Sequence, residues 1–500
     1  MTELKLKNYY LKVLKNFRSS AIFYRYFNQK KRYKEAYSLL IKIISFIKNN
    51  SDEKAKQNIY VSCDKSYFMY VSIIAILLTN NIWIPLSKSL PKKRVKEILK
   101  DVPPNMFIHD GKDDTKNFTK YTKKIYSFSS ISKKKIKVSK MKINSLIDFI
   151  ELNNTAFIYF TSGSTGVSKG IKISHKNIIS DVFAQVTHLH NFSLKKKNKQ
   201  LVFGDYYDTA FSIFFDIFFP AIYLKAALSP GIKKEEILLP VDHCKKNQVN
   251  VLVAVPSTIQ RIKIYYDKKK INHQFNTIIM TGEPFYLNVL KYLFDYLKSK
   301  KIFNCYGGTE MGNWVYYHEC KKTDLFNYKS LNLVPIGKPF SDVKTKILNK
   351  ELVVTGPMIT LGYVNNELNY RKFIFGKKNS TFFTGDLVKK INNNLICIGR
   401  KDYQVKIRGY RIEIPFVEAK LRSIKLIDQC IVIEKKSKNY DNYLMAIIKT
   451  TDKNITVNQI NELLKKELVS YMIPSKIILV KNIPLNSNGK IDRKKIAKDY

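Results

Sequence analysis

The chain has 500 residues, of which 45% are hydrophobic and 13% are aromatic, so it can bury large cores and fold into two or more domains. These values exclude a disordered chain. The formal net charge of +48 is extreme, but the lysines are scattered in short runs over the whole chain. This favours a biased composition over a nucleic-acid-binding surface, although such a charge would also suit an acidic protein partner.

The first residues, "MTELKLKNYYLKVLKNF", contain lysines but no apolar segment, so we expect no signal peptide. Six cysteines without metal-ligand spacing predict reduced thiols and a cytoplasmic location. Two apolar runs, Tyr70–Leu86 and Phe211–Leu228, are interrupted by polar residues. We interpret both as buried segments, so no membrane span is expected.

A loop rich in glycine and hydroxyl residues lies in "YFTSGSTGVSKGIKISH" (159–175). Strand-like segments at Ala156–Phe160 and Ile171–Ile173 hold it at both ends, which argues against a flexible linker. Its spacing differs from G-x-x-x-x-G-K-[ST], yet glycine N–H groups, hydroxyls and a lysine suit a bound phosphate. The candidate phosphate-binding residues are Thr161, Ser162, Gly163, Ser164, Thr165, Gly166 and Lys169.

Buried strand-like segments follow at 250–257, 276–283 and 301–310, and each ends in small or polar residues. Such strands alternating with helices predict an α/β fold, in which ligands bind at the carboxyl ends of the strands. Short strands predominate from 343 to 398. Residues 401–500 alternate strands and helices again, and the segment is of a size to fold separately.

Four further motifs follow the loop in order. They are "NCYGGTEMGNW" (304–314), "FFTGDLV" (382–388), "GRKDYQVKIRGYRIE" (399–413) and "PLNSNGKIDRKKI" (484–496). We expect Asp386 in a turn of the second and Lys490 in a tight Asn-Gly turn of the fourth. With the loop, these motifs closely resemble those of the AMP-forming adenylating enzymes: acyl-CoA synthetases, luciferases and amino-acid adenylation domains. The resemblance extends from about residue 60 to 500, and is greatest to stand-alone amino-acid adenylation domains and D-alanine–carrier protein ligases.

The resemblance implies a large N-terminal domain, residues 1–400, of mixed and parallel sheets flanked by helices, together with a region of short strands. It implies a small mobile α+β lid, residues 401–500, that carries Lys490. The implied enzyme is an AMP-forming acid–thiol ligase, which forms an acyl-adenylate and then a thioester. Because two anions must meet in the first step, cations that neutralise the developing charge do most of the catalysis.

The resemblance also implies roles for single residues. Thr309 would contact the α-phosphate of ATP, Glu310 would bind Mg²⁺, and Lys490 would be the catalytic cation between the carboxylate and the α-phosphate. Asp402 would be the hinge, and Lys406 would serve the thioester-forming conformation. Besides the phosphate loop, the implied ATP-binding residues are Gly282, Glu283, Tyr306, Gly307, Asp386 and Arg400.

The acid substrate is left open. In most amino-acid adenylation domains an aspartate pairs with the substrate's ammonium group, but the matching stretch here, 204–228, has Phe211 or Ser212 at that place. Asp208 lies one helical turn earlier and Asp216 one turn later. Either Asp208 pairs with the ammonium of an amino acid such as D-alanine, or the substrate is a fatty, aryl or hydroxy acid.

The thiol acceptor is open as well. The resemblance implies either the phosphopantetheine of a carrier protein or coenzyme A. The chain ends ten residues after Lys490, so we expect any carrier protein to be a separate partner. No nucleic-acid partner is expected.

Overall fold

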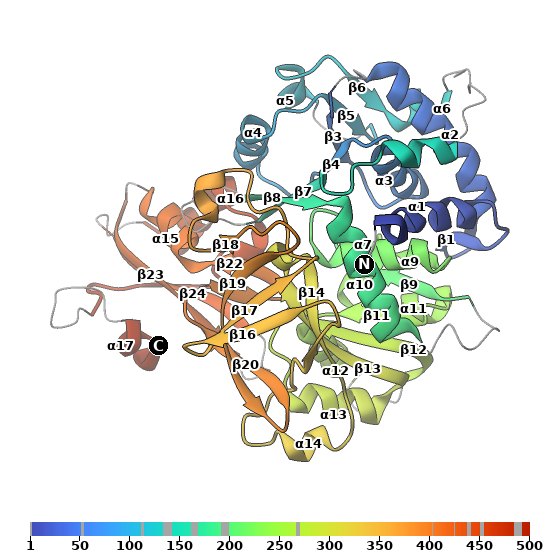
Figure 1. The fold of residues 1–500 in the computed structure, drawn as a ribbon. Helices are drawn as coiled ribbons and strands as arrows, with labels where there is room; N and C mark the ends of the chain where they lie inside the picture. The colour runs from blue at the N-terminus through green and yellow to red at the C-terminus, as the bar shows by residue number, and fades with distance from the viewer. Residues whose placement is uncertain are drawn as a thin grey trace.

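The computed structural model of the protein describes residues 3–51, 55–111, 115–133, 143–161, 169–191, 200–266, 271–402, 404–424, 426–437, 442–450, 455–484 and 493–500. Figure 1 shows two helix-flanked sheets, whose strands lie between residues 22 and 339, a β-rich region beside them, and the C-terminal segment packed against one side. The predicted α/β architecture with a small C-terminal domain is confirmed.

The largest sheet has the strand order β15-β14-β13-β12-β11-β9-β10-β1-β2. Its central strands β13 to β1 run parallel, whereas β14, β15 and β2 pair antiparallel with their neighbours. The buried segments predicted around 250, 280 and 305 are β11, β12 and β13. The strands are β1 Ile22–Tyr26, β2 Gln29–Arg32, β9 Val202–Asp205, β10 Ala227–Pro230, β11 Val251–Ala254, β12 Ile271–Thr281, β13 Leu297–Gly308, β14 Asn313–Glu319 and β15 Lys338–Pro339.

A second sheet has the order β6-β5-β3-β4-β7-β8. It is parallel except for β7 and β8, which pair antiparallel and hold the ends of the predicted phosphate loop. The expectation that strands hold this loop at both ends is therefore confirmed. The strands are β3 Asn58–Ser62, β4 Ile82–Pro85, β5 Met106–His109, β6 Ile125–Ser127, β7 Thr155–Thr161 and β8 Lys169–Ser174.

Helices cover these two sheets (Figure 1). Two of them, α3 and α9, are apolar on nearly all sides and lie in the main core, as expected for helices that contact neighbours all round. The helices are α1 Glu3–Phe17, α2 Tyr33–Asn50, α3 Tyr67–Leu78, α4 Lys92–Asp101, α5 Lys116–Thr119, α6 Phe128–Lys133, α7 His175–Gln185, α9 Ile213–Tyr223, α10 Lys234–Leu238, α11 Val241–Asn247, α12 Pro256–Tyr266, α13 Leu287–Tyr296 and α14 Asp324–Asn327.

The two long apolar runs of the sequence each divide into a helix and a strand. The first contains most of α3 and β4, and the second contains α9 and the start of β10. Within the described parts of the chain, no helix is both long enough and apolar enough to cross a bilayer.

The short strands predicted between 343 and 398 form an antiparallel sheet, β16-β17-β19-β18, with β20 paired to β19. The expectation that Asp386 lies in a turn was wrong, because it lies within strand β19. The reason is Gly385, whose φ of 75° bends the strand locally without ending it. The strands are β16 Lys344–Leu348, β17 Glu351–Gly356, β18 Phe373–Ile374, β19 Ser380–Ile391 and β20 Asn394–Arg400.

The C-terminal segment contains the hairpin β21–β22 and the sheet β23-β24-β25. Its apolar side chains form a core of their own, whose fully buried members all come from residues 407 to 472. The elements are β21 Gln404–Ile407, β22 Tyr410–Glu413, α15 Ile414–Arg422, β23 Ile427–Lys436, β24 Asn442–Thr450, α16 Val457–Glu467, β25 Lys476–Leu479 and α17 Arg493–Asp499.

The close approach of β13 and β14 generates a stability prediction. At Gly307 a Cβ atom would lie 1.5 Å from the carbonyl oxygen of Asn313, whereas at Gly308 the nearest atom would be Met311 Cε at 3.4 Å. We expect Gly307→Ala to lower the free energy of unfolding by about 1–3 kcal/mol, as overpacking does. Gly308→Ala is the matched control and should lower the free energy of unfolding by less. Thermal unfolding followed by circular dichroism measures both, and equal melting temperatures would contradict the close approach.

Candidate active site

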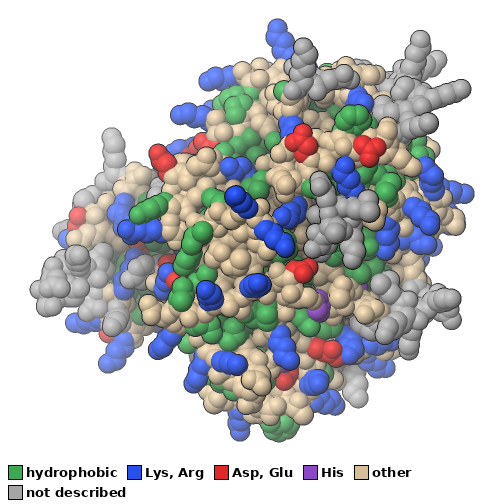
Figure 2. Space-filling model, in the orientation of Figure 1, with side chains coloured by type: hydrophobic (Ala, Val, Ile, Leu, Met, Phe, Trp, Pro, Cys, Tyr) green, Lys and Arg blue, Asp and Glu red, His purple; other side chains and the backbone are tan. Residues whose placement is uncertain are grey.

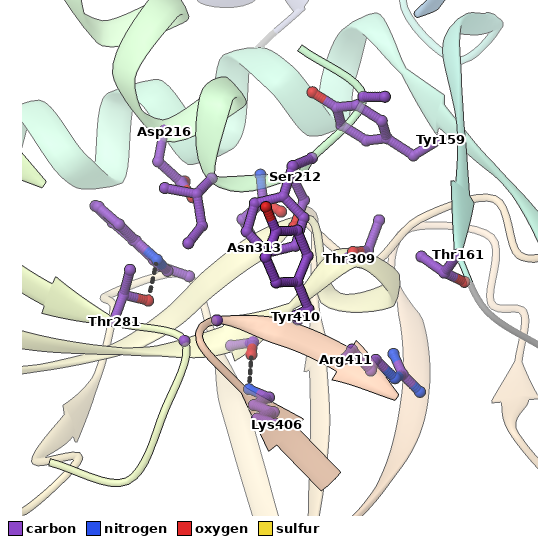
Figure 3. A pocket seen from close by; sticks show the side chains of 18 of the residues that line it. Tyr159, Thr161, Ser212, Asp216, Thr281, Thr309, Asn313, Lys406, Tyr410 and Arg411 are labelled. Atoms are coloured by element: carbon purple, nitrogen blue, oxygen red, sulfur yellow. Dashed lines mark hydrogen bonds between the residues drawn. The ribbon is translucent and has the colours of Figure 1, made fainter. Parts of the chain in front are cut away.

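One pocket lies where the ends of β7, β12 and β13 meet the start of α9 and the hairpin β21–β22 (Figure 3). It contains about 780 Å³ of space and is open to solvent. Because parallel strands end at the same edge of a sheet, residues far apart in the sequence become neighbours at this pocket.

The two ends of the predicted phosphate loop, Thr161 and Lys169, are paired across β7 and β8. Thr161 lines the pocket, and its hydroxyl lies 3.5 Å from the carbonyl oxygen of Lys169. Burial lowers the pKa of Lys169. The residues between these ends, Ser162, Gly163, Ser164, Thr165 and Gly166, lie outside the described residues, and so does Lys490.

Thr309 and Glu310 form a short turn directly after β13. Thr309 lines the pocket, and Glu310 beside it is buried. One carboxylate oxygen of Glu310 accepts a hydrogen bond from the Tyr363 hydroxyl at 2.9 Å, and the other lies 2.5 Å from Arg411 Nη1. Burial raises the pKa of Glu310, but the charge and hydrogen bond of Arg411, a backbone hydrogen bond and the Tyr363 hydroxyl together outweigh burial, so the pKa lies below its ordinary value. Glu310 is therefore a buried carboxylate that stays charged beside a cation.

The predicted adenine and ribose residues form one connected network. The Tyr306 hydroxyl donates a hydrogen bond to Asp386, and Arg400 Nη1 donates to the other oxygen of Asp386 at 2.6 Å. Arg400 also binds both carboxylate oxygens of Asp402, at 2.6 and 2.8 Å. The structure thus brings together the predicted nucleotide residues and the predicted hinge residue at the end of β20.

Gly282 and Glu283 follow β12. Gly282 lines the pocket with a φ of 83°, which suits glycine. The Glu283 carboxylate accepts hydrogen bonds from Ser257 N at 2.8 Å and from Gly409 N at 2.5 Å, and burial raises its pKa to about 6. Since Gly409 belongs to the β21–β22 hairpin, Glu283 joins the two parts of the chain. The sequence motifs carried no signal for this contact.

The hairpin also brings Lys406 to the pocket. Lys406 Nζ lies 3.5 Å from the carbonyl oxygen of Gly307, and burial lowers the pKa of this lysine. Figure 3 shows Tyr410 pointing into the pocket, with Arg411 on the side of Thr161. Tyr410 and Arg411 were not predicted as site residues, although both lie in the motif 399–413.

On the α9 side, Phe211 and Ser212 line the pocket as predicted. Asp208 is exposed and lies outside the described lining of the pocket. Its carboxylate oxygens accept hydrogen bonds from the Ser87 hydroxyl at 2.6 Å and from Ala210 N at 2.9 Å. The structure therefore does not bring Asp208 to the side chains that face the pocket.

Two polar residues face this end of the pocket: Asp216, which the sequence offered beside Asp208 as a possible partner of an ammonium group, and Asn313, which had no predicted role. Within the described lining of the pocket, the only carboxyl group is that of Asp216, which accepts a hydrogen bond from Gln185 at 2.9 Å; burial and the neighbouring Asp181 raise its pKa well above the ordinary value. Asn313 is 3% exposed, and neither polar atom of its side chain has a hydrogen-bond partner among the residues that the structure describes. Buried amides are normally paired, so Asn313 is suited to contact a bound molecule. Asn313 is part of the quoted motif 304–314, but only the fold shows that it faces the pocket.

The pocket lies at the ends of the strands of an α/β body, and a small C-terminal domain covers it. This arrangement, with the predicted nucleotide residues beside the pocket, is that of an adenylate-binding enzyme. Comparison with known families agrees. Residues 14–364 match the family model for the AMP-binding enzyme, and residues 417–490 match that for the AMP-binding enzyme C-terminal domain. The chain belongs to the AMP-binding enzyme family.

A similar curated protein is gramicidin S synthase 2 of Brevibacillus brevis, 29% identical over 499 residues that cover 94% of this chain. The match spans only 10% of that relative's length.

Similar solved structures include the Vibrio cholerae adenylation domain AlmE with glycyl-adenosine-5'-phosphate, at a TM-score of 0.82, 19% identity and coverage of 98% and 97% of the two chains. The o-succinylbenzoate CoA synthetase MenE of Bacillus subtilis has a TM-score of 0.81, 17% identity and coverage of 98% of both chains. NpsA-ThdA of Klebsiella oxytoca, an artificially fused adenylation–PCP di-domain, has a TM-score of 0.77, 18% identity and coverage of 94% and 86%. At these identities the likeness shows the fold alone.

The buried carboxylate generates a testable prediction. Glu310→Gln keeps the shape of the side chain but removes the charge that a hard divalent cation prefers. We expect the rate of ATP–pyrophosphate exchange to fall by about a hundredfold or more, with a weaker dependence on Mg²⁺. Glu319→Gln, at the far end of β14, is the matched control. An unchanged magnesium titration at an unchanged rate would overturn the assignment of Glu310.

Proposed function

We propose that the protein activates a carboxylic acid with ATP as an acyl-adenylate, releases pyrophosphate, and transfers the acyl group to the phosphopantetheine thiol of a separate carrier protein. The observation that carries this proposal is the convergence, on one pocket, of Thr309 and Glu310 from the body with the lid hairpin β21–β22. The connected Tyr306–Asp386–Arg400 network beside the pocket supports a nucleotide as the bound substrate.

ATP fits this set of groups. Tyr306 would stack on the adenine, Asp386 and Arg400 would hold the ribose hydroxyls, and Gly282 and Gly307 offer backbone without side-chain bulk. The phosphates would lie between Thr309 and the loop that starts at Thr161. Because Glu310 is buried and charged, it requires a cation, and its oxygen ligands suit Mg²⁺. Bound there with ATP, Mg²⁺ would neutralise charge on the phosphates.

The acid activation requires a second cation at the reacting carboxylate. We assign this role to Lys490, which would bridge the carboxylate and the α-phosphate. Residues 1–400 and 401–500 would be two bodies that rotate about Asp402, so that the lid presents Lys490 in the first step and the β21–β22 hairpin in the second. The separate core of the lid supports this division.

The acid itself is proposed to be an amino acid. Support comes from the similarity to gramicidin S synthase 2 and to an adenylation domain solved with a glycyl-adenylate. Trp314, whose indole N–H donates to Thr281 Oγ1 at 2.8 Å, lies in the wall of this part of the pocket and suits a small substrate such as D-alanine. The alternative is a fatty, aryl or hydroxy acid with coenzyme A or a carrier as acceptor, which the aromatic rings of Phe211 and Tyr159 favour.

The proposed partner is an acidic carrier protein. Figure 2 shows Lys and Arg side chains spread over the visible face, a distribution that suits weak attraction of an acidic partner better than a defined nucleic-acid groove. The similarity to a fused adenylation–PCP structure supports a carrier as the acceptor. All six cysteines are free thiols, which supports the proposed cytoplasmic location.

The two-step proposal predicts that Lys490→Ala separates the half-reactions. Adenylation, measured by ATP–pyrophosphate exchange, should be abolished, because the bridging cation is gone. Transfer from a supplied acyl-adenylate to a thiol should survive, because the lid turns Lys490 away in that step. If both half-reactions fell equally in a folded variant, the two-conformation proposal would be wrong.

The amino-acid proposal predicts a difference between two aspartates. If Asp216, at the pocket, attracts the substrate's ammonium group, Asp216→Asn should raise the KM for the amino acid by roughly tenfold or more and spare the KM for ATP. Asp208→Asn should change the KM for the acid little, because this side chain is exposed and pairs with Ser87. An exchange screen that responds to hydroxy or fatty acids and to no amino acid would decide for the alternative.

A further inference from the structure

The side chain that contacts the Glu310 carboxylate most closely among the described residues belongs to the lid. Arg411 lies in β22, and its Nη1 is 2.5 Å from Glu310 Oε2 although the two residues are 101 positions apart in the sequence. The Glu310 side chain is 2% exposed and that of Arg411 is 23% exposed. Coulomb attraction is strong at such a short distance and low exposure, because little water screens it.

Both oxygens of the Glu310 carboxylate are engaged in this arrangement. Oε1 accepts the Tyr363 hydroxyl, and Oε2 holds the guanidinium. Mg²⁺ requires oxygen ligands at about 2.0–2.1 Å in a nearly ideal octahedron, so at Glu310 it would compete for the lone pairs of Oε2 with the guanidinium that already lies there at hydrogen-bond distance. Two cations at the same carboxylate would also repel each other at short range.

The other lid contacts at the pocket do not involve Glu310. Gly409 N donates to Glu283, Lys406 lies near the carbonyl oxygen of Gly307, and the Tyr410 ring stacks on Tyr471 at a centroid distance of 3.9 Å. These contacts hold the hairpin in place, and a cation bound at Glu310 would not directly change any of them. The Arg411 contact is the one that a divalent cation at Glu310 would directly replace.

We propose that Arg411 is a positioning residue that takes the place of the divalent cation at Glu310, so that the hairpin β21–β22 enters the pocket only when Glu310 carries no metal. The lid position described here and metal occupancy of Glu310 then exclude each other. This inference rests on the proposed function, in which Glu310 holds Mg²⁺ during adenylation. It orders the two steps, since loss of the metal with pyrophosphate must precede entry of the hairpin that serves acyl transfer.

Hydrogen–deuterium exchange of residues 404–413 tests the proposal without using catalysis. The full chain is measured with AMP alone, with AMP plus pyrophosphate in EDTA, and with AMP plus pyrophosphate and Mg²⁺. We expect protection of the hairpin in the first two conditions. In the third condition, hydrogen exchange of the hairpin should become roughly tenfold faster. A tenfold change lies within the range of about 5–150-fold that typical coupling free energies between two sites produce.

Variants at position 411 sharpen the test. Arg411→Gln should exchange fast in all three conditions, and Arg411→Lys should restore part of the protection because it keeps the charge. Arg408→Gln, in the exposed turn of the same hairpin, is the matched control and should behave like the unaltered protein. Titration with Mn²⁺ in the presence of pyrophosphate should show that Mn²⁺ binds more tightly to Arg411→Gln than to the unaltered protein. The reason is that the guanidinium, which competes with the ion for Glu310, is absent from this variant.

Three results would overturn the proposal: protection that ignores Mg²⁺, release of the hairpin by pyrophosphate in EDTA, or an Arg411→Gln variant as protected as the unaltered protein. None of these measurements needs a known acid substrate. An absence of ATP–pyrophosphate exchange with every acid would therefore contradict the proposed function. The hydrogen–deuterium exchange of the hairpin tests the role of Arg411 independently of that result.

Discussion

The arrangement of the active site depends on one buried negative charge. Glu310 lies between the end of β13 and the lid, and an unpaired carboxylate at such a place would cost several kcal/mol. The structure satisfies it with Tyr363 from the body and Arg411 from the lid. A charged Glu310 side chain needs a cation beside it. Since the lid supplies that cation as Arg411, the position of the lid depends on which cation Glu310 contacts.

The contact between lid and body is suited to such a link. Beyond the pocket, it includes ion pairs such as that between Lys93 on α4 and Glu467 on α16, at 2.6 Å, and the Arg94 guanidinium over the Phe416 ring. The fully buried apolar side chains of the lid pack among themselves. Interfaces made of polar contacts between separately packed cores can re-form in another orientation at modest cost. A rotation of the lid therefore need not expose either core.

The acid-binding end of the pocket differs chemically from the nucleotide end. At the nucleotide end, charged side chains pair with one another, as Asp386 does with Arg400. Beside α9, no described residue pairs with the buried amide of Asn313, and the Asp216 carboxyl group accepts a hydrogen bond from a neutral amide. A buried polar group without a partner is costly, so the Asn313 amide suits contact with polar atoms of a bound molecule.

The sequence alone determined the strands around 250, 280 and 305 and the strand-bounded loop at 159–175, because short apolar segments and turn-forming residues act locally on the backbone. The roles of Thr309, Glu310, Asp386 and Arg400 were implied by the family resemblance of their motifs, and they stay predictions. The sequence misplaced Asp386 in a turn, since Gly385 can bend a strand as readily as end it. It also favoured Asp208, whereas helix α9 brings Asp216 to the pocket and Asp208, in the segment before α9, is exposed and pairs with Ser87. Only the tertiary structure decided that Arg411 meets Glu310 and that Gly409 meets Glu283. These pairs are joined by the docking of one folded body on another, and spacing along the chain carries no information about that docking.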